Sequence, residues 1–359
     1  MKRRRSCNRR RAAGGLQRHL SGDGLILRFL YTILKIAVSA GLIAVLVSRI
    51  GAGAIVASLG RTDPVWLSAA LLLFTASYGL GALQWAMLLR GEGIRLPFRR
   101  TLAFYYVGLF FNNFLPSQLG GDMFRMFDVR KATSDTAAAV STVFLDRVFG
   151  LLLMSGLAVF SGPFILSGRD VNPLFWGFIL LLIAGWTLAL CLFFSKRMAR
   201  PLAWVFERVV SKRFHVRCRA IYEKIHRFGR NRRLLVSVLM VSLIVQTMRI
   251  LTHCLVGRAL GLSFPVLYYF LLIPAVAILA SLPVSIGGLG IREQTAVILF
   301  SAVGMYGEDA AVMEFLAYLV AIVTSMPGGI IFTLRRRAVR VSSVLAEAPL
   351  REIVRPNDS

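Results

Sequence analysis

Acidic residues and histidines are scarce in this sequence, which limits the chemistry it can perform. There are 17 Asp and Glu against 43 Lys and Arg, and only 4 His, which are too dispersed to hold a metal. No H-E-x-x-H, nucleophile elbow or Walker loop occurs, and Gly288-x-Gly290 lacks the strand context of a dinucleotide site. No hydrophilic block reaches the roughly 100 residues of a soluble catalytic domain. We therefore expect no enzyme activity, no cofactor and no metal.

Paired cysteines are also absent. The 4 cysteines lie at positions 7, 191, 218 and 254, with no repeated spacing. A disulfide framework and a zinc site both require cysteines in pairs or regular groups. Neither is therefore expected.

Apolar residues, in contrast, are abundant. They make up 57% of the 359 residues, with a mean hydropathy of +0.68. A soluble domain cannot bury this much apolar surface, so the composition indicates a polytopic, all-α membrane protein. The formal charge of +26 does not indicate nucleic-acid binding, because the basic residues cluster between apolar runs, as in membrane topology signals.

Six apolar stretches are long enough to span a membrane, which takes about 20 residues. The predicted spans are 25–47, 64–89, 137–166, 173–194, 234–256 and about 304–334. The basic segments between them predict which loops face the cytoplasm. The cytoplasmic parts would be the basic tail 1–24, the segment 195–233 and the tail 335–359. We expect a multi-pass protein of a bacterial-type inner membrane with both termini cytoplasmic.

A seventh apolar run, 102–115, is too short to cross comfortably and is followed by Arg125, Arg130 and Lys131. If this run spanned the membrane, these basic residues would lie outside, against the charge rule. A re-entrant hairpin that returns to the cytoplasm removes the conflict. Its irregular backbone would need polar partners within the membrane. Nearby side chains of this kind are Asn112, Asn113 and Gln118.

The motif in this hairpin occurs twice. Residues 115–125 and 282–292 both read Leu-Pro-x-x-aliphatic-Gly-Gly-x-x-x-Arg. The shift that superimposes the first copy on the second also moves the span 137–166 onto the last span. The pattern predicts an inverted-topology repeat with halves 25–166 and 167–334, the plan of many secondary transporters. The second motif would be a second re-entrant hairpin or two short spans, and charge alone does not choose between them.

The two motifs offer anion binding. Backbone N–H groups at glycine pairs can approach an oxyanion closely, and Arg125 and Arg292 can clamp a phosphate. The alternative is that the glycines only permit tight helix crossing. The candidate substrate-binding residues are Asn112, Asn113, Gln118, Gly120, Gly121, Asp122, Arg125, Asp146, Arg147, Ser285, Gly287, Gly288, Arg292 and Glu293.

Charges inside predicted spans are candidates for function. Asp146 and Arg147 are adjacent, so on a helix they point about 100° apart and pair poorly with each other. We expect partners elsewhere, for example Arg125 or Arg292 for Asp146. Asp122 would balance Arg125 or contact a cationic head group. A purely structural salt-bridge network is the alternative for these residues.

Three stretches resemble the transmembrane family of lysylphosphatidylglycerol synthases. They are Asn113-Phe114-Leu115-Pro116 to Gly120-Gly121-Asp122-x-x-Arg125, Leu145-Asp146-Arg147-x-x-Gly150, and Leu282-Pro283 to Gly287-Gly288-Leu289-Gly290-Ile291-Arg292-Glu293. The resemblance covers about residues 25–335. It implies a flippase-like domain that moves a phospholipid. The 335–359 tail is too short for the aminoacyl transferase that the bifunctional members carry.

The sequence therefore predicts a transporter of an anionic or modified phospholipid or glycolipid, working by alternating access. The alternative is a membrane scaffold or accessory subunit of a lipid-modifying or glycosyl-transfer enzyme, with 195–233 as its docking surface. A third alternative is transfer chemistry by Asp146 or Glu293 itself. The expected partners are a membrane lipid, a separate lipid-modifying enzyme and a second copy of the chain, with no nucleic acid.

Overall fold

The structure is a computed structural model that describes two long stretches of the chain and a few residues between them. The described residues are 60, 62–114, 120–166, 177, 180, 183–188, 224, 228, 231–281, 288 and 290–347. The helices are α3 (Pro64–Gly91), α4 (Phe98–Phe114), α5 (Gly120–Thr133), α6 (Thr136–Leu166), α10 (Arg232–Ala259), α11 (Val266–Ala280), α12 (Ile291–Ser301) and α13 (Gly307–Glu347). No strand occurs among these residues, so the all-helical fold class is confirmed for them.

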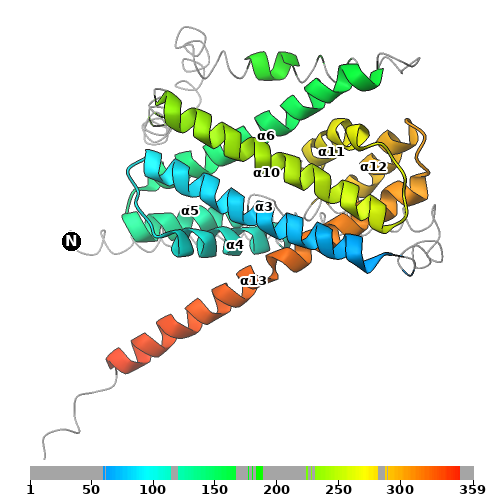
Figure 1. Cartoon of the computed structure of the whole chain (residues 1–359). Coiled ribbons are helices and arrows are strands. Elements are labelled where there is room, and N and C mark those ends of the chain that lie inside the picture. Colours follow the sequence, from blue (N-terminus) through cyan, green and yellow to red (C-terminus); the bar gives the residue numbers. More distant parts are fainter. Residues whose placement is uncertain are drawn as a thin grey trace, which may run out of the picture.

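Four helices are long and apolar enough to cross a membrane. They are Pro64–Gly91, Thr136–Phe164, Arg232–Ala259 and Gly307–Arg335. They confirm four of the six predicted spans. The predicted span 25–47 lies outside the described residues, as does most of 173–194. Past the last span, α13 continues to Glu347, and its end projects away from the other helices in Figure 1.

The long helices begin where local chemistry favours it. Asp63 precedes α3 and its carboxylate accepts the Val65 N–H at 2.8 Å. Pro64 follows at the first helical position, where its missing N–H costs nothing. In the same way, Asn231 precedes α10 and accepts the Leu234 N–H at 3.2 Å. Such caps satisfy backbone donors that the helix leaves free.

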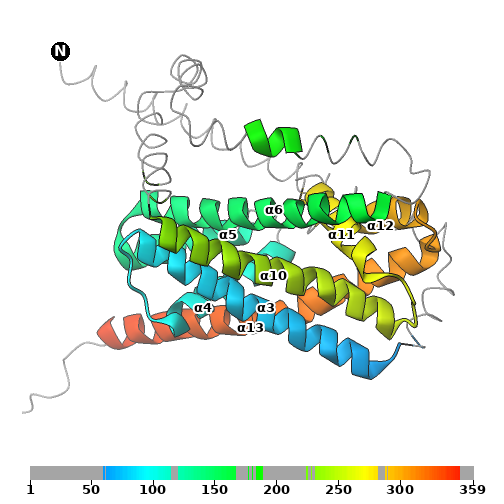
Figure 2. The ribbon, with the colours of Figure 1, turned by 45° about the horizontal axis from the view of Figure 1, so that its top comes forward.

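α3 and α10 pack side by side and antiparallel (Figures 1 and 2). The Asp63 N–H donates to the Ala259 carbonyl at 2.7 Å, which ties the start of α3 to the end of α10. At the other end, Gly91 faces Phe228 and Leu234. α4 packs against α13, and α11 packs against α6. These three pairs enclose the centre of the molecule.

The two motifs lie where short helices meet. α4 has 17 residues and α11 has 15. At 1.5 Å per residue, a 17-residue helix is about 26 Å long, which is shorter than the hydrocarbon core of a membrane. Each is followed by a second short helix, α5 or α12, that packs against it. Whether these hairpins are re-entrant stays a prediction.

Glycines let the short helices approach their neighbours closely. A Cβ on Gly121 of α5 would collide with the backbone carbonyl of Gly108 in α4. A Cβ on Gly328 of α13 would collide with the carbonyl of Tyr106 in α4. Small residues at such crossings are typical of packing between membrane helices. α4 is thus held by glycine contacts on two sides.

Two apolar clusters fill the interior at different levels. One cluster is built around Trp85, Leu88 and Phe104, where α3 ends and α4 begins. The other is built around Tyr269 and Phe300, in α11 and α12. Between these clusters in sequence, α3 and α10 carry polar side chains, among them Tyr78, Gln246 and Arg249. These three line the cavity described below.

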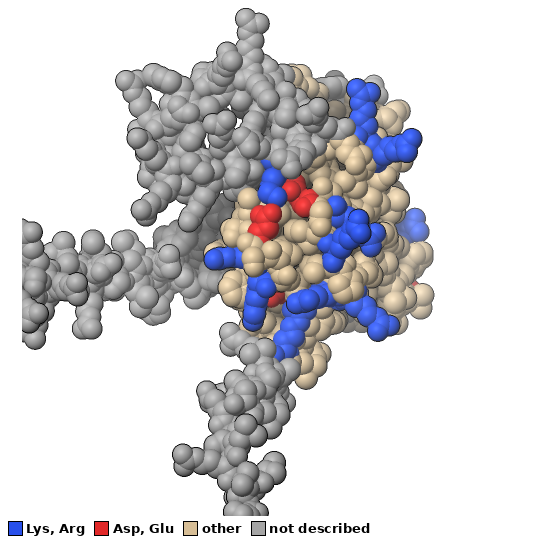
Figure 3. Space-filling view, turned by 90° about the vertical axis from the view of Figure 1, so that its left-hand side faces the viewer, with Lys and Arg blue, Asp and Glu red and all other residues tan. Residues whose placement is uncertain are grey.

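One end of the molecule is strongly basic (Figure 3). Here α3 ends, α4 and α10 begin, and the turn between α5 and α6 lies nearby. Lys224 connects these segments, because its ammonium group lies 3.1 Å from Glu92 Oε2 and 3.0 Å from Asp135 Oδ2. The Ala138 N–H and then Lys224 lower the pKa of the Asp135 carboxyl from its ordinary value. The basic residues in these segments are Arg90, Arg95, Arg99, Arg100, Arg130, Lys131, Arg232 and Arg233.

The close approach of α13 to α4 gives a stability prediction. Gly328→Ala forces a methyl group against the Tyr106 backbone, so we expect the free energy of unfolding to fall by about 1–3 kcal/mol. The control is Gly156→Ala in α6, where an added Cβ meets nothing within 4 Å. Thermal unfolding in detergent measures both variants. Equal stability of Gly328→Ala and the wild type would contradict this packing.

Candidate substrate pocket

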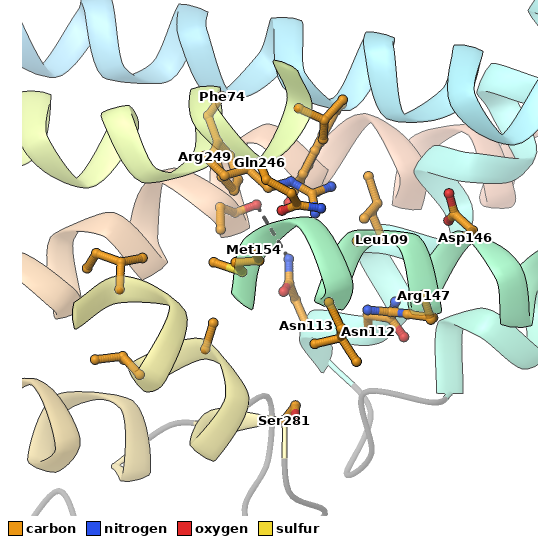
Figure 4. A pocket seen from close by; sticks show the side chains of 18 of the residues that line it. Phe74, Leu109, Asn112, Asn113, Asp146, Arg147, Met154, Gln246, Arg249 and Ser281 are labelled. Atoms are coloured by element: carbon orange, nitrogen blue, oxygen red, sulfur yellow. Dashed lines mark hydrogen bonds between the residues drawn. The ribbon is translucent and has the colours of Figure 1, made fainter. Parts of the chain in front are cut away.

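A cavity of about 260 Å³ lies at the centre of the helices. It is lined by the middle turns of α3, α6, α10 and α13, together with the ends of the short helices. Figure 4 shows Gln246 and Arg249 entering it from α10, Asn112 and Asn113 from the end of α4, and Arg147 from α6. These lining positions lie near the middle of helices that are long and apolar enough to cross a membrane, so we expect the cavity to lie at mid-membrane depth.

The described lining of the cavity carries an excess of positive charge. Four guanidinium groups reach it, against the carboxyl groups of Asp146 and Glu314. The four arginines are Arg125, Arg147, Arg249 and Arg292. Ionisable side chains at this depth are costly unless they are paired or have a function. Each one therefore needs a physical account.

Arg125 is held on every side. Its guanidinium is 2.8 Å from Asp146 Oδ2 and 3.5 Å from Asp122 Oδ1. It also stacks on the rings of Trp85 and Tyr105, at 4.2 Å and 4.6 Å from their centroids. The side chain is only 4% exposed. Arg125 is one of the two partners predicted for Asp146, and the contact leaves its charge neutralised.

A second ion pair lies beside the first. Arg147 contacts Asp122 through two atoms, with Nε at 2.7 Å and Nη2 at 3.1 Å. Asp122 is itself buried and therefore pairs with two arginines at once. Gln84 completes the network by donating to Asp146 Oδ1 at 3.0 Å. As expected, Asp146 and Arg147 pair with other residues and not with each other.

Arg249 and Arg292 differ, because no ion pair joins either of them to a described acidic residue. Arg249 donates to the Tyr105 hydroxyl at 3.4 Å, and Arg292 lies over the Tyr318 ring at 5.0 Å. The sequence explains the difference for Arg292. When the two motifs are aligned, Arg292 matches Arg125, but Leu289 and Met313 match Asp122 and Asp146. The second motif therefore lacks the two acids that neutralise the first.

The amides and acids of the motifs have mainly structural contacts. Asn112 accepts the Gly121 N–H at 2.9 Å, and Asn113 donates to Ser325 Oγ at 3.0 Å. Glu293 caps the start of α12 by accepting the Gly290 N–H at 2.6 Å. Because its N–H is occupied by Asn112, Gly121 serves helix packing in this structure.

Several predicted site residues line the cavity and others do not. Those that line it are Asn112, Asn113, Arg125, Asp146, Arg147 and Arg292. Four others are buried in the first turn of a short helix: Gly120, Gly121 and Asp122 in α5, and Glu293 in α12. Gly288 precedes α12 and adopts a φ of +81°. Gln118, Ser285 and Gly287 lie outside the described residues.

The list of candidate substrate-binding residues also left out residues that line the cavity. These include Gln84, Tyr105, Gln246, Arg249, His253 and Glu314. Arg249 and Glu314 carried a usable signal, since each is a charge within an apolar run. Gln84, Tyr105 and Gln246 carried none, because a single polar residue in a span is common and its facing partner is unknown from sequence.

Comparison with known proteins agrees with this architecture. Residues 32–328 match the family described as the lysylphosphatidylglycerol synthase TM region. This chain belongs to that family. The match covers all eight described helices except the last part of α13. The resemblance predicted from the three motifs is therefore confirmed.

Curated relatives of this chain carry a general name. A UPF0104 membrane protein of Pyrococcus horikoshii is 25% identical over 306 residues, which is 79% of this chain and 90% of the relative. A UPF0104 membrane protein of Methanothermobacter thermautotrophicus is 26% identical over 297 residues, 76% of this chain and 84% of the relative. Both names describe membrane proteins and give no substrate.

The ion-pair network gives a second stability prediction. Asp146→Asn leaves the buried Arg125 with only its longer contact to Asp122, so we expect a loss of about 3–5 kcal/mol in unfolding free energy. Combining it with Arg125→Met removes the unpaired charge, so the double variant should be more stable than Asp146→Asn alone. Chemical unfolding in detergent measures these two variants and Arg125→Met alone, with the exposed Glu308→Gln as control.

A double variant that is less stable by the sum of the two single losses would contradict this account. Such additivity would mean that Arg125 and Asp146 act independently.

Proposed function

We propose that this protein is a flippase-like transporter of a phospholipid or glycolipid with an anionic head group. The observation that supports it is the polar cavity at mid-membrane depth, with four arginines against two acids in its described lining. A phosphate there would be held by Arg249 and Arg292, whose charges are not paired with a described acid. Charge-assisted hydrogen bonds from arginine are the strongest contacts that a phosphate makes.

Helix packing supports alternating access between two related halves. The shift that superimposes the first motif on the second moves α3 onto residues 231–258 and α4 onto residues 265–281. These ranges nearly coincide with α10 and α11. The packing corresponds as well. In the first half α4 contacts α13, and its counterpart α11 contacts α6, which is the counterpart of α13. An arrangement of this kind is typical of inverted-repeat transporters, whose substrate sites lie between the repeats. We propose that the halves rock about the cavity.

The charge distribution supports an orientation. The basic end of Figure 3 would face the cytoplasm under the positive-inside rule. The connection between α12 and α13 would then face outward. The inner membrane of a bacterial-type cell fits this orientation. The alternative role as an accessory subunit depends on the segment 195–233, which lies almost entirely outside the described residues.

Transport can be tested in vesicles that contain fluorescent phosphatidylglycerol. The wild type should speed transfer between leaflets, and Arg292→Ala should slow it roughly ten- to hundredfold, because a hydrogen bond to a charged group contributes about 1.5–3 kcal/mol. Arg258→Ala is the matched control. Arg258 is on α10 and stacks on Trp66 at 5.2 Å, but it does not line the cavity.

The outcomes separate the proposals. Equal rates for the wild type and Arg292→Ala would remove Arg292 from the site. No acceleration by the wild type would contradict transport of this lipid and leave the accessory role as the better explanation. An enzyme that co-purifies through 195–233 would then be sought by neutralising the basic residues of that segment.

The orientation and the repeat predict which side of the membrane each hairpin faces. In a chain without native cysteines, Lys131→Cys at the end of α5 should be labelled only from the cytoplasm. Tyr306→Cys, at a position that is 80% exposed between α12 and α13, should be labelled only from outside. A membrane-impermeant maleimide reports both. Labelling of both from one side would contradict the inverted repeat.

A further inference from the structure

One carboxyl group in the cavity has no hydrogen-bond partner among the described residues. Glu314 of α13 is fully buried, and neither of its carboxyl oxygens accepts a hydrogen bond from them. A basic atom, Nδ1 of His253 in α10, lies 3.4 Å from Glu314 Oε1. This nitrogen likewise has no hydrogen-bond partner in the described part of the chain. Two polar groups that need a partner therefore face each other at the cavity wall.

The other acids near the cavity each accept at least one hydrogen bond from a described residue. Asp122 and Asp146 accept from arginines, and Glu293 accepts the Gly290 N–H. Leaving a buried polar group without a hydrogen bond costs several kcal/mol in an apolar medium, and leaving a charge unpaired costs more. The contact between Glu314 and His253 therefore lacks the hydrogen bonds that hold Asp146, and it is an ion pair only when the histidine is protonated.

A proton is the ligand that fits this geometry. A protonated carboxyl can donate to the imidazole nitrogen, and an imidazolium N–H can donate to the carboxylate. In either arrangement one proton lies between His253 Nδ1 and Glu314 Oε1 and gives each of these atoms a partner. Among the described residues, no group of three metal-binding side chains occurs, so a metal ion has no comparable set of ligands here.

Proton binding would change the charge of the cavity. Ionisable groups of the neighbouring helices line the cavity with Glu314 or interact with it electrostatically. They are Tyr78 of α3, Arg249 and His253 of α10, Tyr269 of α11, and Arg292 and Glu293 of α12, while Tyr318 lies one turn further along α13. Of these, Arg249 and Arg292 are the arginines without a described acidic partner. An added proton on the pair strengthens the positive field that these two arginines present to an anion.

We propose that Glu314 and His253 form a proton-binding site that is coupled to the anionic head group. This inference rests on the proposed transport function. Binding of an anion beside Arg249 and Arg292 favours proton uptake by the pair, and loss of the proton favours release of the anion. A proton gradient across the membrane then supplies the driving force, since the cavity accepts head group and proton together.

The pH dependence of binding tests the coupling. Dioctanoyl phosphatidylglycerol is titrated into the purified full chain in detergent, over roughly pH 5 to 8. For one linked proton, affinity rises as pH falls, by at most about tenfold per pH unit. Glu314→Gln mimics the protonated carboxyl, so its affinity should be nearly independent of pH and close to the wild-type value at low pH. Glu308→Gln, exposed on the same helix, should keep the wild-type slope.

A second measurement does not depend on lipid binding. Infrared difference spectra of the reconstituted protein detect the carbonyl stretch of a protonated carboxyl. A band that titrates with pH in the wild type and in Glu308→Gln, and is absent in Glu314→Gln, supports the site. If Glu314→Gln does not fold, His253→Gln replaces it and should shift the titration of the band.

Each result decides between the proposals. Binding that is independent of pH in the wild type, or an unchanged slope in Glu314→Gln, overturns proton coupling and leaves the head-group site in place. Absence of binding at every pH overturns the proposed substrate class instead. In that case the infrared spectra still decide whether the pair takes up a proton, and spectra with no titrating carboxyl or imidazole band overturn the site.

Discussion

A charge placed inside a membrane needs a partner, and the structure depends on how Arg125 meets this requirement. Its guanidinium lies over the rings of Trp85 and Tyr105 and contacts Asp146 and Asp122. These residues come from α3, α4, α5 and α6. Four helices are thus joined at one buried cation. A side chain that looks like a phosphate clamp in sequence is a structural centre in the fold.

The corresponding arginine of the second motif has another environment. Leu289 and Met313 stand where the first half has acids, so Arg292 lacks those ion pairs. Glu314, in turn, occupies the position that matches Arg147 of the first half. One half therefore carries a closed ion-pair network, and the other carries an arginine and a carboxyl that form no ion pair with each other. This difference in charge between similar helices fits the proposal that one half holds the structure while the other half binds the head group.

The glycines of the two motifs also differ in their structural roles. Gly121 lies against Gly108, and its N–H is occupied by Asn112. Close packing lets α5 present Arg125 to the interior, because a larger residue would push the two helices apart. In the second motif, Gly288 and Gly290 adopt positive φ values of 81° and 84°, which favour glycine. There the glycines form the turn that leads into α12.

The sequence by itself determined the membrane class, four of the spans that the structure describes, the family and most of the charged residues at the cavity. Length, hydropathy and motif spacing are local properties, so they can be read along the chain. It did not determine which charges pair. The choice of Arg125 over Arg292 as the partner of Asp146, and the meeting of His253 with Glu314, depend on the packing of helices distant in sequence. Only the tertiary structure brings these side chains together, because residues on different helices meet through helix crossing, which no single segment encodes.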